Sequence, residues 1–184
     1  MTYSISLSNV ALAIGLIGLL THIAILFFEP AQVRRFLMSL PRHKQAGIGL
    51  MVLADIWMTI LLQSVDLGEF SDMRMTLILC TNALFILTII FLPDFLFARA
   101  MGIILLLGTE VLLSAAFLVE HPAKHIITVL AYAWAIVGMF FVASPYLLRD
   151  IIEWGTRTDL RLRAGAVAKL TFSVVLVALG IWVF

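Results

Sequence analysis

Six apolar stretches, each close to the length that crosses a membrane, constrain this chain more than any other feature. A bilayer core of about 30 Å requires about 20 apolar residues in an α-helix. Strands of a membrane barrel would be about 10 residues long and would alternate apolar and polar residues. We therefore predict an all-α, polytopic membrane protein, with residues 1–184 forming a single transmembrane domain. The predicted spans are residues 5–28, 46–65, 75–92, 100–119, 126–148 and 164–184.

Composition excludes the other broad classes of protein. The chain is 63% hydrophobic and 12% charged, whereas a soluble domain averages about 45–50% apolar and about 25% charged residues. The single cysteine, Cys80, excludes an intrachain disulfide framework. The first apolar run has no basic region before it and is too long for the hydrophobic region of a signal peptide, so we expect it to be retained as a span.

The basic residues predict an orientation in the membrane. Ten of the twelve lysines and arginines flank the same three connections, and only Arg74 and Lys124 lie on the other side. Because cytoplasmic loops carry the excess of lysine and arginine, we expect both termini outside, in a multi-pass protein of the cell membrane, here a bacterial inner membrane. Residues expected to face anionic lipid headgroups are Arg34, Arg35, Arg42, Lys44, Arg157, Arg161 and Arg163. The simpler interpretation is that they set topology and bind nothing specifically.

The chain also reads as three helical hairpins with a common pattern. The first helix of each ends at a proline, Pro30, Pro93 or Pro145, and a basic connection follows. The second helix of each opens with a pair of small residues, and a polar residue lies eight positions beyond the glycine. Internal repeats are common in membrane transport folds, although chance resemblance in an apolar sequence is the alternative. After Pro30 and Pro145, helical apolar spacing next to arginine predicts two helices lying at the membrane surface.

Two carboxylates lie where water is scarce. Asp55 and Glu110 are about 13 and 15 Å into their predicted spans at 1.5 Å per residue. A carboxylate at that depth costs at least about 2.5–3.5 kcal/mol, so each should face the bundle, find a partner or take up a proton. Candidate partners on the third span are Thr81, Asn82 and Thr88.

Helical spacing extends these carboxylates into a predicted buried polar site. Asp55 shares a face with Thr59, Glu110 shares one with Ser114, and Lys169 shares one with Ser173. Three interpretations remain open for this site: proton or cation binding, a structural staple such as Asp55 with Lys169, and an interface with another subunit. Lys169 is close enough to the span end for its amine to reach the cytoplasmic surface instead.

The remaining patterns carry little chemistry. His121 and His125 flank Pro122 in a short loop, which we interpret as an ordinary polar connection rather than a metal site. The sequence holds no nucleotide-binding, hydrolase, zinc-protease or redox motif, and its basic residues lie beside the membrane, so we expect no catalysis, cofactor or nucleic-acid partner. The preferred function is that of a small accessory or assembly subunit, packing against other membrane subunits or itself. The alternative is a proton- or ion-coupled carrier or channel that uses Asp55 and Glu110.

Overall fold

The computed structural model describes residues 6–117 and 119–184, and this part of the chain is helical with no strand. It confirms the all-α class and the six helices long and apolar enough to cross a membrane. Their bounds follow the predicted spans to within a few residues at most ends. The six helices are α1 (Leu7–Phe27), α3 (Lys44–Ser64), α4 (Arg74–Phe91), α5 (Leu96–Phe117), α6 (Lys124–Ala143) and α8 (Asp159–Trp182).

Local signals explain where the prediction of the span ends was wrong. Residues 144–148 were placed in the fifth span, but α6 ends at Ala143 and the chain turns at Ser144 and Pro145. Proline has no N–H to continue the backbone hydrogen bonds of α6. The last span was predicted to start at residue 164, but α8 starts at Asp159, because the Thr158 side chain caps it by accepting from the Arg161 N–H.

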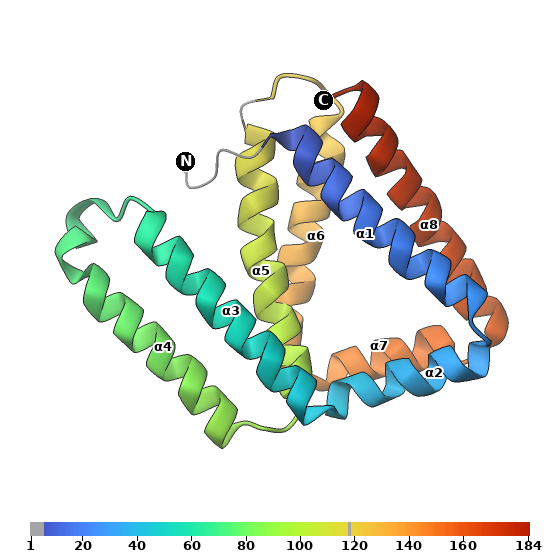
Figure 1. Ribbon diagram of the computed structural model, residues 1–184, viewed down its shortest axis with the longest axis horizontal. Coiled ribbons are helices and arrows are strands. Elements are labelled where there is room, and N and C mark those ends of the chain that lie inside the picture. Colours follow the sequence, from blue (N-terminus) through green and yellow to red (C-terminus); the bar gives the residue numbers. More distant parts are fainter. Residues whose placement is uncertain (1–5, 118) are drawn as a thin grey trace.

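Two amphipathic helices lie across the ends of the spans, as the spacing after Pro30 and Pro145 predicts. They are α2 (Pro30–Ser39) and α7 (Tyr146–Thr156), and they contact each other. Both lie along one edge of the molecule in Figure 1. The 3-10 helix η1 (Leu40–Arg42) joins α2 to α3, and a second one, η2 (Gly68–Met73), joins α3 to α4 at the opposite edge. The connection between α3 and α4 is acidic, with Asp66, Glu69 and Asp72, and it lies on the side opposite to the basic connections.

The packed pairs of helices differ from the grouping that the repeat pattern suggested. Helices joined by the basic connections, such as α1 and α3, run apart, as Figure 1 shows. The pairs that pack are α5 with α6, α1 with α8, α3 with α5, and α3 with α4. Three antiparallel pairs therefore exist, but two of them are joined at the edge opposite to the basic connections. The third, α1 with α8, brings the two ends of the described chain together.

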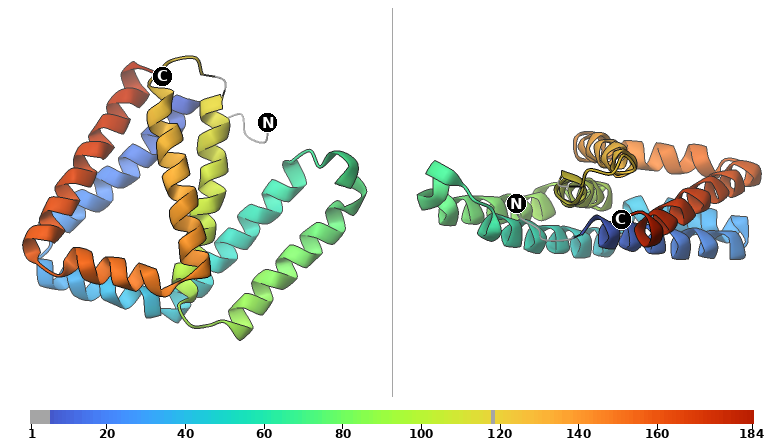
Figure 2. Two further views of the ribbon diagram at one scale, coloured as in Figure 1. Left: turned by 180° about the vertical axis from the view of Figure 1, so that it is seen from behind. Right: turned by 90° about the horizontal axis from the view of Figure 1, so that it is seen from above.

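The assembly is flat and open rather than a compact bundle. Seen from above in Figure 2, the helices form a shallow layer. Two hydrophobic clusters hold it together. One joins α1, α5, α6 and α8 around Leu112, Ile127 and Leu176, and the other joins α3, α4 and α5 around Met51 and Leu96. Helix α5 contributes to both clusters and is the most buried span.

Glycines set the closest helix contacts. A Cβ atom on Gly102 of α5 would lie 2.7 Å from the carbonyl oxygen of Gly138 on α6, and a Cβ on Gly138 would lie 2.8 Å from that of Gly102. On α1, a Cβ on Gly15 would lie 2.6 Å from a methyl of Val177 on α8. Small residues let membrane helices approach closely, and packing rather than a hydrophobic force drives their association. The α5–α6 and α1–α8 pairs depend on this.

Candidate functional site

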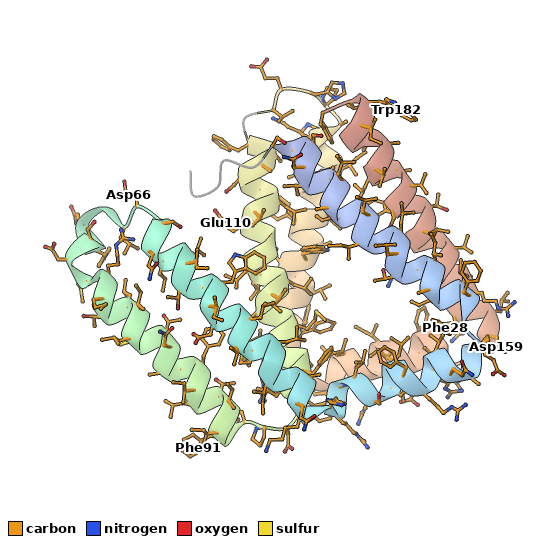
Figure 3. All side chains as sticks on the ribbon, in the orientation of Figure 1. Phe28, Asp66, Phe91, Glu110, Asp159 and Trp182 are labelled. Carbon is orange, nitrogen blue, oxygen red and sulfur yellow. The ribbon has the colours of Figure 1, made fainter. Side chains whose placement is uncertain are left out.

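Glu110 lies on the face of α5 that packs against α3. Ile103 and Leu107, seven and three residues earlier, belong to the cluster that contains α3, and residues at such spacing share a helix face. One carboxylate oxygen, Oε1, accepts a hydrogen bond of 2.8 Å from the Ser114 hydroxyl. The other, Oε2, is buried and has no hydrogen-bond partner in the described part of the chain. Figure 3 labels Glu110 midway along α5.

Asp55 lies on α3 next to the buried Ala54. Its Oδ1 atom is also buried and without a hydrogen-bond partner among residues 6–117 and 119–184. An unpartnered buried carboxylate oxygen is costly. Both predicted carboxylates are therefore half-buried, and each has one enclosed oxygen with capacity for a proton or a cation.

The register of α3 against α5 separates the two carboxylates. A Cβ on Gly47 of α3 would lie 2.7 Å from the backbone nitrogen of Phe97 on α5, which fixes the register. From this contact, Asp55 is eight residues along α3 and Glu110 is thirteen residues along α5. At 1.5 Å per residue the two levels differ by about 8 Å. The helices also diverge in that direction, as Figure 1 shows. The two carboxylates are therefore two separate sites, one on α3 and one on α5.

Thr59 and Asn82 form a hydrogen bond with each other instead of with the carboxylates. The Thr59 hydroxyl on α3 donates to the Asn82 Oδ1 on α4 at 2.9 Å. This bond lies between two helices that are otherwise joined by few buried residues. Thr88, another candidate partner on α4, donates to the Leu84 carbonyl of its own helix at 2.8 Å. The Thr59–Asn82 hydrogen bond therefore links α3 to α4, whereas Thr88 bonds within its own helix.

Lys169 and Ser173 lie in a different part of the fold. Ser173 is buried against Gly18 of α1, and its hydroxyl donates to the Lys169 carbonyl at 2.9 Å. The Lys169 side chain is exposed. Within the described residues the one ion pair joins Arg149 and Asp150, so no salt bridge links Lys169 to a carboxylate. The three pairs of polar residues that we expected to form one buried site are therefore separate. One pair lies on α3, one on α5 and one at the α1–α8 contact.

The structure also shows polar contacts that sequence reasoning missed. Thr109, buried beside Glu110 in the chain, donates to the Leu105 carbonyl at 2.9 Å and lies 3.3 Å from the Ala131 carbonyl on α6. The position of Thr109, a polar residue inside a predicted span, was the sequence signal that could have pointed to this contact. Arg74 donates to the carbonyls of Leu62, Gln63 and Val65 at 2.5, 2.7 and 2.9 Å. Arg74 therefore caps the end of α3, because the last carbonyls of a helix have no partner within it.

The basic residues predicted to meet lipid headgroups are all exposed. They lie on or beside α2, α3 and the α7–α8 junction at the same edge of the molecule. One of them, Arg161, has its guanidinium 5.2 Å from the ring centroid of Trp154, a cation–π contact at that junction. The set is Arg34, Arg35, Arg42, Lys44, Arg157, Arg161 and Arg163.

The histidines make local contacts. The Nδ1 atom of His121 accepts from the Ala123 N–H at 3.2 Å, and its ring meets Phe184 edge-on at 6.4 Å. Among the described residues no group of three or more histidine, cysteine or acidic side chains is placed to hold a metal ion. Comparisons of this chain with models of protein families, with curated proteins and with solved structures give no match.

Proposed function

We propose that this integral membrane protein is a non-enzymatic subunit that works by assembling with another membrane protein. The observation that carries the proposal is its open shape. Its accessible surface is 11269 Å², whereas a compact monomer of 20.4 kDa would expose about 8,800 Å². Lipid covers apolar surface in a bilayer, but helix faces that a compact bundle would bury remain free here for a partner.

Helix α4 offers the clearest face for such a partner. Only 11% of the residues in the apolar stretch that includes it are buried, against 44% for α5. It is attached to the rest of the molecule through α3 and lies at one end of the layer in Figures 1 and 2. Membrane helices associate through close packing and interhelical hydrogen bonds, and α4 makes few such contacts within this chain.

The sole cysteine provides a test in native membranes. Cys80 is exposed on α4, so a benzophenone maleimide attached there will photocross-link to a protein that packs on this face. We expect a discrete product heavier than 20.4 kDa, whose components mass spectrometry identifies as two copies of this chain or as this chain and a second protein. The product should be absent when Cys80→Ser is treated with the same reagent. Only lipid adducts, together with a monomeric mass in mild detergent, would contradict the proposal.

The alternative function is a proton- or ion-coupled carrier or channel, favoured by the unpartnered oxygens of Asp55 and Glu110. Its test uses the isosteric substitutions Asp55→Asn and Glu110→Gln in liposomes. Loss of an ion flux with unchanged cross-linking at Cys80 would favour the carrier. Loss of cross-linking at Cys80, with no flux in the parent protein, would favour assembly.

A further inference from the structure

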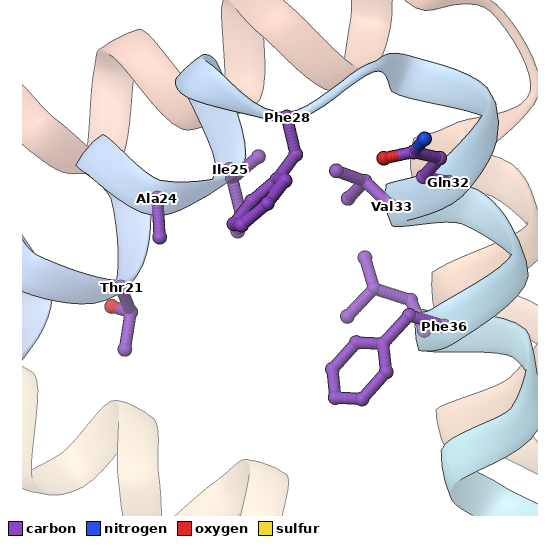
Figure 4. Close-up of a pocket in the computed structure, with 8 residues that line it drawn as sticks. Thr21, Ala24, Ile25, Phe28, Gln32, Val33 and Phe36 are labelled. Carbon is purple, nitrogen blue, oxygen red and sulfur yellow. The ribbon is translucent and has the colours of Figure 1, made fainter.

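A pocket of about 530 Å³ lies in the angle between the end of α1 and the start of α2. The chain bends there at Phe28 and Glu29, which have extended backbone conformations, before Pro30 starts α2. The volume is within the range of about 300–1,000 Å³ typical of sites for small molecules. Figure 4 shows side chains of both helices facing this space. The lining residues are Thr21, Ala24, Ile25, Phe28, Gln32, Val33, Phe36 and Leu37.

The wall of this pocket is almost entirely hydrocarbon. Thr21 offers no free hydroxyl hydrogen, because its Oγ1 donates to the Ile17 carbonyl at 2.8 Å and lies 3.1 Å from that of Gly18. Gln32 lies at the rim in Figure 4. Phe28 and Phe36 border the pocket while 60% and 63% exposed. A polar ligand would lose its hydration here without replacement, so the occupant must be apolar where it enters.

The basic residues near the pocket favour an occupant whose polar end is negatively charged. Residues 29–45 carry Arg34, Arg35, Arg42 and Lys44 against one acidic residue, Glu29. The Arg34 guanidinium is exposed, and no hydrogen bond or ion pair engages it in the described part of the chain. The residues of α2 that line the pocket are Gln32 and Val33 and, one turn later, Phe36 and Leu37. Arg34 and Arg35 lie between these two pairs, so they are on the opposite, polar side of the helix. An amphipathic helix with this pattern lies at the boundary between acyl chains and headgroups.

We propose that this pocket holds one acyl chain of an anionic phospholipid, whose headgroup is bound by the arginines of α2. An apolar cavity lined by an amphipathic helix that carries arginines on its polar side matches the two halves of such a lipid. The inference does not depend on the assembly function, since it concerns α1 and α2 rather than α4. It makes α2 a lipid-anchored element that holds the bend at residues 28–30.

The test compares two substitutions of the same type on α1. Ala24→Phe fills the pocket, whereas Ala13→Phe adds the same ring to an exposed position that does not line it. The purified variants are mixed with phosphatidylglycerol or phosphatidylcholine in mild detergent, and bound lipid is counted by native mass spectrometry. We expect the parent protein and Ala13→Phe to retain one phosphatidylglycerol, and Ala24→Phe to bind it at least tenfold more weakly.

The arginines are tested separately from the pocket. Arg34→Gln and Arg35→Gln should each weaken phosphatidylglycerol binding about fivefold, and leave phosphatidylcholine binding unchanged. Equal helicity and elution of Ala24→Phe and Ala13→Phe show that the variants fold alike. Equal lipid binding by those two variants, or no preference for phosphatidylglycerol in the parent, would overturn the proposal. A protein cross-linked to a photoreactive group at Leu37 would overturn it too, by showing a different occupant.

Discussion

The pairs α1–α8 and α3–α4 show two ways of holding membrane helices together. Helices α1 and α8 are far apart in sequence, yet they pack through Gly15, Gly18 and Gly180, and the Ser8 hydroxyl donates to the Gly180 carbonyl at 2.6 Å. Helices α3 and α4 are consecutive, but no glycine of theirs meets the other helix. They are joined by the Thr59–Asn82 hydrogen bond, by the Arg74 cap and by the packing of Phe85 in the cluster around Met51. Close packing therefore follows the small residues and not the connectivity of the chain.

The largest expected effect tests the glycine contact. Gly15→Leu places a side chain against the Val177 backbone nitrogen, 3.0 Å from the position of Cβ, and the Ser173 carbonyl, 3.1 Å away. Because backbone cannot move aside cheaply, we expect the free energy of unfolding to fall by about 1–3 kcal/mol or more. Unfolding in graded denaturing detergent measures it. Gly165→Leu is the control, since a Cβ there meets nothing within 4 Å, and an equal loss would break the comparison.

A smaller effect is expected from the cap of α3. Arg74→Met removes donors to three carbonyls while keeping a long side chain. We expect a loss of about 1 kcal/mol, because Arg74 is only half-buried and water can replace part of its hydrogen bonding. Hydrogen exchange should rise at the end of α3 and in η2, while the α1–α8 pair stays protected. Lys124→Met is the matched control, being the other basic residue at this edge. Increased exchange in α1 and α8 would show that the two pairs are coupled.

The smallest effect is expected from the polar link between α3 and α4. A double-mutant cycle with Thr59→Val and Asn82→Leu should give a coupling energy of about 0.6 kcal/mol, the average for hydrogen bonds between membrane helices. The same unfolding measurement yields all four corners of the cycle. A coupling energy near zero would mean that the Arg74 cap and the packing of Phe85 hold α4 without help from this bond. A value above about 1.7 kcal/mol would exceed what such bonds have been found to supply.

Much of the architecture could be predicted from local sequence. Apolar stretch length predicts the six spans, and the amphipathic spacing after Pro30 and Pro145 predicts α2 and α7. The predicted polar site fared differently, because helical periodicity tells which residues share a face of one helix and not which helix that face meets. Ser173 was grouped with the carboxylates by its spacing, yet it packs against Gly18. Asn82 was a candidate partner for the carboxylates, yet it accepts from Thr59.

The sequence by itself determined that this chain is helical, how many times it can cross a bilayer, and which connections share one side. These properties follow from the length and polarity of single segments, and backbone hydrogen bonds are satisfied within each helix. Only the tertiary structure decided that α1 pairs with α8, that α5 joins the two clusters, and that Asp55 and Glu110 lie at different levels. In a membrane every apolar face resembles every other, so the partner of a helix is chosen by shape, at contacts as small as Gly102 against Gly138.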